Sequence, residues 1–343
     1  MAGTWTDQNK TIPGAYINFR ANSPLSLTAG DRGIVVILQE VKTGIKGTMY
    51  KVTSQENELP ATADKTFANE ALKGASTVYV YNLNPTAHAL SDVQAAFKKL
   101  ATFTFNVLVY PYETSENAQA VATWIGLMRN DEGVKVQGVI PKYTGDKEYI
   151  INPVQAIILE GGTELPVGAV ACYVGGITAG ANINESNTNR KYVGAIDVNP
   201  RMTKTEMEAA IKAGKYIFKV DNAQNVTSVY DINSLTTINA EKGKSFTKNR
   251  TIRTIDGINN DIVNIFESNY LGGKTNNNED GRSLLRSTLI EYFNQLQLMN
   301  AIQNFEEKDV EVIKGSDKES VTINCNIQTV DSIEKIYITV NLA

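Results

Sequence analysis

Apolar and polar residues alternate near both ends of the chain, a pattern typical of strands with one buried face. Near the start, a Pro13-Gly14 turn signal precedes a segment that places Ala15, Ile17 and Phe19 on one face. Near the end, residues 336–342 alternate in the same way and contain no charged residue. We therefore predict a strand at each end, and the first has no hairpin partner beside it in the sequence.

Between residues 33 and 140, continuous apolar runs alternate with helical patterns. The runs, typical of buried strands, are Gly33–Gln39, Thr77–Tyr81, Phe103–Tyr110 and Val134–Ile140. Helices with one apolar face separate the later runs, and Ser91 and Ser115 are placed to cap them. Strands and helices that alternate over short links predict an α/β fold with a doubly wound, mostly parallel sheet.

The stretch Pro166–Gly180 is apolar and rich in small residues. Its glycines Gly176 and Gly180 are four residues apart, so a helix here would let another backbone approach closely. The composition changes after Asp197, and we place a domain boundary there.

The remaining chain predicts an α+β body. Thr203 and Glu206 form a capping-box pattern that opens a short helix, and a hairpin of strands at 216–220 and 226–230 follows. Two long amphipathic helices come next, the first ending at Gly272. Apolar residues on the second helix are Leu285, Leu289, Tyr292, Leu296, Met299 and Ile302. Alternating strands at 321–327 and 336–342 complete the chain.

These patterns divide the 343 residues, more than the roughly 100–200 typical of one domain, into four parts. We predict an N-terminal arm over residues 1–22 and an α/β domain over residues 23–197. An α+β domain with the two long helices follows over residues 198–330, and a C-terminal arm over residues 331–343.

The composition limits the classes of partner. A net charge of −4 argues against nucleic acid, because phosphate binding needs a basic face. No apolar run approaches the ~18 residues of a membrane span, so we expect no membrane insertion. The opening residues lack the apolar core of a signal peptide, so we expect synthesis in the cytoplasm and a soluble chain.

The residue inventory offers little catalytic chemistry. His88 is the one histidine of the chain, and we expect a loop histidine of this kind to face solvent. Nucleophilic catalysis with an imidazole base needs a histidine held by a partner, and a histidine-rich metal site needs more than one. Cys172 and Cys325 lie in apolar stretches, which favours buried reduced thiols. We expect no enzyme activity, cofactor or metal.

Three short motifs resemble ligand loops but fail on spacing. Gly243-Lys244-Ser245 resembles the end of a phosphate loop, yet Ile238 stands where the first glycine is needed. Residues 276–281 resemble the start of a calcium loop, yet Ser287 stands where the bidentate glutamate is needed. The paired glycines at 161–162 and 175–176 fit no dinucleotide fingerprint. Turns, helix caps and tight packing explain all three.

A basic cluster precedes the first long helix. It consists of Lys242, Lys244, Lys248, Arg250 and Arg253. Two interpretations remain open: a solvated face, or an electrostatic contact with an acidic surface of another subunit.

The terminal strands therefore become the main functional candidates. A terminal strand has unpaired N–H and C=O groups along its edge, and it either folds back onto its own body or pairs with another chain. If both ends of each subunit pair with neighbours, an open polymer can grow.

The residues also resemble a known family, the sheath subunits of contractile tails in myoviruses, defective prophages and R-type bacteriocins. Pro13-Gly14-Ala15-Tyr16-Ile17 is similar to the family's opening, with Ala15 in place of the commoner valine. Residues 248–256 (KNRTIRTID) look like the entry into its conserved helix. Residues 276–282 with the helix after them, then paired strands ending on 336–342, look like its ending.

This resemblance implies a function as a structural subunit of a contractile sheath. Copies of the chain would form hexameric rings, stacked helically around an inner tail tube protein. Neighbouring copies would be linked by their terminal arms, and baseplate and tail-terminator proteins would be further partners. Contraction would drive the tube through a target cell envelope. The particle would assemble in the bacterial cytoplasm and be released as a virion or phage-tail-like particle.

The resemblance and the alternation together indicate residues of the assembly interfaces. The expected intersubunit arm residues are Tyr16, Ile17, Phe19, Ile336, Ile338 and Val340. Candidates for contact with the tube or a neighbour are Lys248, Arg250, Arg253, Arg282, Arg286 and Glu291. The alternative hypothesis is a doubly wound nucleotide-binding enzyme with a helical accessory domain, which the first half of the chain supports and the missing glycine fingerprint opposes.

Overall fold

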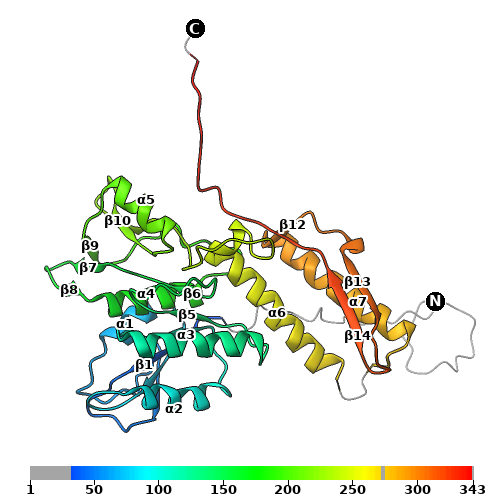
Figure 1. Cartoon of the computed structure of the whole chain (residues 1–343), viewed down its shortest axis with the longest axis horizontal. Coiled ribbons are helices and arrows are strands. Elements are labelled where there is room, and N and C mark those ends of the chain that lie inside the picture. Colours follow the sequence, from blue (N-terminus) through cyan, green and yellow to red (C-terminus); the bar gives the residue numbers. More distant parts are fainter. Residues whose placement is uncertain (1–31, 272–274, 342–343) are drawn as a thin grey trace, which may run out of the picture.

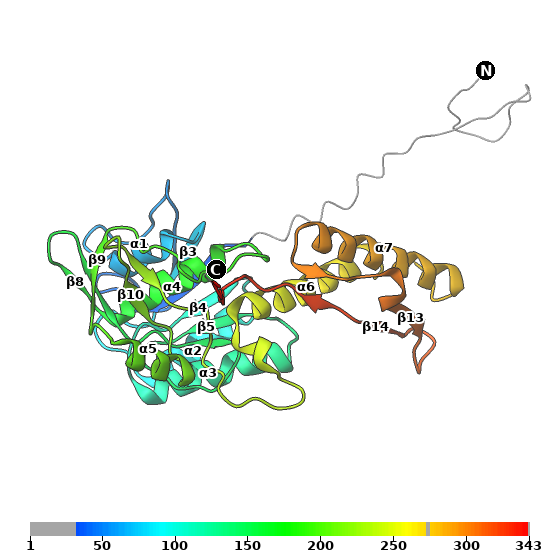
Figure 2. The same ribbon diagram turned by 90° about the horizontal axis from the view of Figure 1, so that it is seen from above.

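The computed structural model describes residues 32–271 and 275–341, which form two packed bodies joined by one long helix (Figure 1, Figure 2). The larger body contains the parallel sheet with its covering helices. The smaller body contains two long helices and short strands. The expected N-terminal arm, with Tyr16, Ile17 and Phe19, lies outside the described residues, as does Leu342 at the other end.

A six-stranded sheet forms the centre of the larger body, in the order β2-β3-β1-β4-β5-β6. Its strands are β1 (Ile34–Gln39), β2 (Met49–Val52), β3 (Thr77–Asn82), β4 (Val107–Val109), β5 (Gln137–Val139) and β6 (Ile150–Ile151). Neighbouring strands pair in parallel, except that β2 runs antiparallel to β3 at one edge. The predicted mostly parallel sheet is confirmed, although β4 and β5 are shorter than the apolar runs that contain them.

Helices cover both faces of this sheet and form two apolar cores with it. On one face lie α1 (Thr66–Leu72) and α4 (Val167–Gly180), and on the other lie α2 (Leu90–Leu100) and α3 (Ser115–Asn130). α4 is buried on all sides, which explains why its sequence is apolar throughout instead of amphipathic.

The glycines of α4 allow α1 to approach it closely. A Cβ atom on Gly176 would lie 2.0 Å from the carbonyl oxygen of Ala71, and one on Gly180 would lie 1.8 Å from that of Gly74. The prediction that this glycine pair admits another backbone is therefore confirmed. Any side chain at either position would force the two segments apart.

Two small sheets and one helix complete the larger body. They comprise β7 (Ala156–Leu159), β8 (Glu164–Leu165) and β9 (Ala195–Asn199), then α5 (Lys204–Lys212) and the hairpin of β10 (Phe218–Val220) and β11 (Val226–Ser228). Tyr216, Phe218 and Val226 belong to the same apolar core as the central sheet. Residues 198–234, which the sequence analysis placed in the second domain, thus pack with the first.

The smaller body is built on α6 (Asn249–Asn269) and α7 (Glu279–Leu298). Their facing side chains, including Ile258, Ile265, Leu289 and Phe293, form a separate core. The other elements are two 3-10 turns, η1 (Lys244–Thr247) and η2 (Glu307–Asp309), with β12 (Ile302–Gln303), β13 (Val310–Lys314), β14 (Val321–Cys325) and β15 (Gln328–Thr329). Among the described residues, the helices lack the combination of length and apolar character that a membrane span requires.

Local differences from the predicted elements have simple causes. α2 begins after Ala89, whose N–H donates to the Asp92 carboxylate, so Ser91 is not its cap. α7 ends at Leu298, so Ile302 belongs to β12 and not to the helix. The predicted capping box of α5 is present, with the Glu206 N–H donating to the Thr203 hydroxyl.

Replacing Gly176 with alanine should lower the free energy of unfolding by about 1–3 kcal/mol, because the new methyl group overlaps the α1 backbone. Chemical denaturation of the full chain measures this change. The matched control is Gly243→Ala, since a Cβ atom there meets nothing within 4 Å and should change stability by less than about 0.5 kcal/mol. Equal effects of the two substitutions would contradict the close approach.

Candidate functional site

The last described residues form an extended segment that projects from the protein (Figure 1). Of the predicted C-terminal arm over residues 331–343, only residues 335–341 project in this way, and from here on the name C-terminal arm refers to these residues. Ile336, Ile338 and Val340 are 74%, 79% and 74% exposed, and the arm pairs with no strand of the described chain. Figure 2 views the arm nearly end-on, so it points across the long axis of the molecule. The sequence left open whether this segment folds back, and here it does not.

Glu334 holds the root of this arm. Its carboxylate accepts hydrogen bonds from the Thr188 hydroxyl (2.6 Å) and the Ser186 hydroxyl (3.2 Å), and it forms an ion pair with Lys248. Thr188 and Ser186 lie in a loop of the larger body, whereas Lys248 directly precedes α6. We call these four residues the root cluster. They attach the chain at residue 334 to the junction of the two bodies.

Lys248 is the charged centre of the root cluster. Its ammonium group lies 3.2 Å from the Asp331 carboxylate and 4.2 Å from the centre of the Tyr230 ring, in addition to its pair with Glu334. Burial lowers the pKa of Lys248, but the hydrogen bonds to Glu334 and Tyr230 outweigh burial and raise its pKa above the ordinary value. The ammonium group therefore remains charged throughout the neutral pH range.

The basic cluster is largely buried. Lys248, Arg250 and Arg253 are only 8%, 6% and 1% exposed, so the interpretation as a solvated face is wrong for them. Arg250 donates to the Ser332 hydroxyl at 2.7 Å, and Arg253 donates to the Glu185 carbonyl oxygen at 2.6 Å. These cations join distant parts of their own chain, and their contact with the tube or a neighbour stays a prediction.

The candidates on α7 lie at the surface of the smaller body. Arg282 donates to the Asn277 side chain at 3.1 Å, and Arg286 donates to the Val310 carbonyl oxygen at 2.8 Å. Glu291 is exposed. The structure does not bring these three residues together with the root cluster, so they would serve a separate contact.

The first half of α6 is docked on the larger body through buried polar groups. Arg129 of α3 donates two hydrogen bonds of 2.7 Å to the two carboxylate oxygens of Asp256. Both side chains are less than a tenth exposed. This bidentate geometry matches a planar guanidinium to a planar carboxylate, and burial makes breaking the pair costly. The pair spans 127 residues of sequence, which no local pattern predicts.

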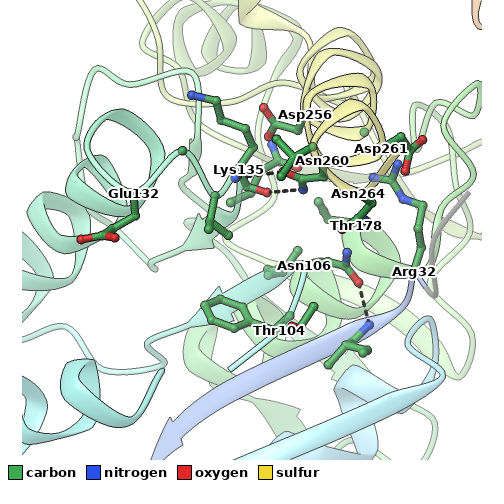
Figure 3. A pocket seen from close by; sticks show the side chains of 18 of the residues that line it. Arg32, Thr104, Asn106, Glu132, Lys135, Thr178, Asp256, Asn260, Asp261 and Asn264 are labelled. Atoms are coloured by element: carbon green, nitrogen blue, oxygen red, sulfur yellow. Dashed lines mark hydrogen bonds between the residues drawn. The ribbon is translucent and has the colours of Figure 1, made fainter. Parts of the chain in front are cut away.

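A polar cleft of about 580 Å³ lies beside this contact, between the sheet and α6 (Figure 3). Arg32 lines it near the start of β1, and Asn260 of α6 bonds the backbone of Lys135 through both its amide oxygen and its amide nitrogen. Burial and the nearby Arg253 lower the pKa of Arg32 to about 10, which still leaves it charged at neutral pH. The described residues contain no cluster of ligands for a metal ion. The cleft lies at the junction between the two bodies, because residues of both the sheet and α6 line it.

His88 lies at the carboxyl ends of the parallel strands, where many α/β proteins bind ligands. Its side chain is 6% exposed, so the expectation that it faces solvent is wrong. The ring Nδ1 lies 2.6 Å from Glu40 and Nε2 lies 2.8 Å from the Tyr110 hydroxyl, which also accepts a hydrogen bond from Asn117. Its imidazole thus has protein partners at both ring nitrogens and links the ends of β1 and β4.

The chain matches two sequence profiles of one family. The profile of the phage tail sheath protein central domain matches residues 87–234, and that of the phage tail sheath C-terminal domain matches residues 241–343. The chain belongs to the phage tail sheath family. The two profiles leave residues 235–240 unmatched. This stretch lies between β11, the last strand of the larger body, and η1, which leads into α6.

Curated relatives include the tail sheath protein of Clostridium phage phiCD119, which is 25% identical over 95% of this chain and 98% of its own length. The phage-like element PBSX protein XkdK of Bacillus subtilis is 31% identical over 80% of this chain, and YqbK of the same bacterium is 33% identical over 74%. The matches span only 61% of XkdK and 56% of YqbK.

Solved sheath structures share the fold. The sheath tail protein of Desulfitobacterium hafniense is 29% identical, with a TM-score of 0.83 over 95% of this chain and 99% of its own. The sheath of the anti-feeding prophage in the contracted state is 15% identical, with a TM-score of 0.71 over 97% of this chain and 100% of its own. At that identity the similarity concerns the fold alone.

Replacing Asp256 with asparagine should lower the free energy of unfolding by about 3–5 kcal/mol, because it leaves the buried Arg129 without its counter-charge. Urea denaturation measures the loss. The matched control is Glu56→Gln, which breaks the exposed pair with Lys51 and should have little effect. A loss no greater than that of the control would show that the Arg129 pair does not hold α6.

Replacing Glu334 with glutamine should loosen the arm root and lower the free energy of unfolding by about 1.5–3 kcal/mol, because a charged acceptor is lost. Limited trypsin digestion after Lys335 should become faster than in the unsubstituted chain. Glu319→Gln, at an exposed turn, is the control. Unchanged digestion and stability would mean that Glu334 does not fix the root.

Proposed function

We propose that this chain is the structural subunit of a contractile tail sheath. The observation that carries the proposal is the C-terminal arm: apolar, uncharged after Lys335, exposed, and anchored at one point by the root cluster. An isolated subunit gains nothing from exposing Ile336, Ile338 and Val340. Their burial in a neighbouring copy would contribute roughly 1.5–3 kcal/mol for each side chain that becomes fully buried.

The smaller body offers an acceptor for such an arm. β13 and β14 form a two-stranded antiparallel sheet, and neither pairs with a third strand within the described residues. An added strand would satisfy the open backbone groups along one edge of this sheet. The N-terminal arm, through Tyr16, Ile17 and Phe19, would be the second link between subunits.

In the proposed assembly, six copies form each ring around an inner tube protein, and the rings stack helically. The larger body, with its doubly wound sheet, and the smaller body would move as units while the arms keep neighbours connected. New contacts between subunits in the contracted form would supply the free energy. The anti-feeding prophage sheath, solved in a contracted state, has the same fold and supports this proposal.

Other partners follow from the same proposal. A baseplate would trigger contraction, and a terminator would close the far end. Arg282, Arg286 and Glu291 on α7, with the cations at the start of α6, are the proposed contacts to the tube or to a neighbour. The sheath would assemble in the bacterial cytoplasm and leave with the virion or phage-tail-like particle. We propose no catalytic role. The α/β sheet by itself would also fit the nucleotide-binding alternative, but the missing glycine fingerprint opposes that alternative.

Ile338→Asp should abolish sheath formation, because a carboxylate would have to be buried in the joint between subunits. The thermal midpoint of the monomer should change little, since Ile338 is 79% exposed. Electron microscopy and thermal denaturation measure the two effects. Ile45→Asp is the control, at a similarly exposed position on the larger body. A large loss of monomer stability would show that the arm belongs to its own body.

Deleting residues 1–20 should leave a folded chain that no longer forms sheaths. The expected N-terminal strand has no local partner in the sequence, so its proposed role is polymerisation and not folding. Circular dichroism tests the fold, and electron microscopy tests assembly. If the shortened chain unfolds, or if it polymerises like the full chain, the proposed role of this arm is wrong.

A further inference from the structure

A groove of about 650 Å³ opens beside the root of the C-terminal arm. Its apolar lining comes from Ile211 of α5, from Tyr230 and Ile232 after β11, and from Leu235 and Ile238 in the loop that follows. Ile238 is 52% exposed, so the groove presents apolar surface to solvent. Nothing within the described residues fills it.

The arm starts on the rim of this groove. Glu334 and Lys335 are themselves lining residues, and the Lys335 ammonium lies 6.0 Å from the centre of the Tyr230 ring. The next six residues are uncharged and include Ile336, Ile338 and Val340. An apolar groove and an exposed apolar segment therefore stand next to each other in one chain.

The arm is long enough to enter the groove. Ile338 lies three positions after Lys335 in the sequence, which corresponds to about 10 Å of extended chain. Closing so short a tether costs little loop entropy. The root cluster holds residue 334 in place, so only the residues after it need to change direction.

We propose that the arm has a second, closed position, in which residues 336–340 lie in this groove of their own subunit. The structure shows the open position. In the free subunit the closed position hides the apolar face that a neighbour would otherwise bind.

Tethering favours the chain's own arm over that of another copy as the occupant. A short flexible tether gives an effective concentration in the millimolar range, whereas a second copy in solution is present at its bulk concentration. At micromolar subunit the advantage is about a thousandfold. Only a growing sheath, which holds a neighbour's acceptor strand beside the arm, would compete.

The closed position would therefore delay polymerisation, a consequence that rests on the proposed function. Because Ile336 and Ile338 cannot occupy the groove and the interface with a neighbouring subunit at once, only subunits with the arm in the open position can assemble. If one subunit in ten is open, the rate of joining falls about tenfold. Closure itself requires no sheath and can be tested on the monomer.

The decisive experiment is a disulfide cross-link within the full chain. Cys325→Ser removes the half-buried thiol, Cys172 stays buried, and Ile238→Cys with Ile338→Cys supplies the pair. Mild oxidation of the dilute monomer should give an intramolecular disulfide, visible as faster migration on a non-reducing gel and as a linked peptide by mass spectrometry. The control replaces Ile238→Cys by Leu127→Cys, which is 50% exposed on α3 outside the groove, and should give at least tenfold less product.

The outcomes are distinct. No excess over the control would overturn the closed position. A cross-link that forms only between chains, and grows with concentration, would assign the groove to a second copy and would also overturn it. A second variant, Ile238→Asp, should place a charge in the groove and speed the onset of assembly. Unsubstituted monomers that never assemble would count against the proposed function alone.

Discussion

The docking of α6 on the larger body depends on ionic groups that are buried away from water, above all the Arg129–Asp256 pair. Such groups are costly to leave unpaired, so they admit few alternative positions of the helix. Other residues of α6, such as Ile258 and Ile265, instead pack in the core of the smaller body. One helix thus belongs to both bodies and holds them together by two different kinds of interaction.

The contacts of residues 328–334 define where the exposed C-terminal arm begins. Residues 328–330 still bond to the smaller body, through the β12–β15 pairing and the hydrogen bond from Val330 to Ala301. The chain then returns to the junction, where Arg250 holds Ser332 and the root cluster holds Glu334. Beyond that point Lys335 lies near the Tyr230 ring, and the described residues after it pair with no strand.

The sequence predicted those features that depend on local pattern. Small-residue spacing predicted the close approach of α4, and the capping-box pattern predicted the start of α5. The strand predicted from period-two alternation at 336–342 is an extended segment without strand pairing in the described residues. Of the two interpretations left open for the basic cluster, the solvated face is wrong for Lys248, Arg250 and Arg253, because the sequence does not show their partners. Those partners, Glu334, Asp231 and Glu185, lie at least 22 residues away in sequence, where no local period connects them. The strand at 310–314 was missed for a related reason, since only its pairing with β14 identifies it.

The position of the root cluster has a mechanical consequence. Glu334 bonds both to a loop of the larger body and to Lys248, which directly precedes α6. A pulling force on the arm would therefore reach the meeting point of the two bodies directly, bypassing the short strands of the smaller body. In the proposed assembly, such a force would act along α6 and on the buried Arg129–Asp256 pair.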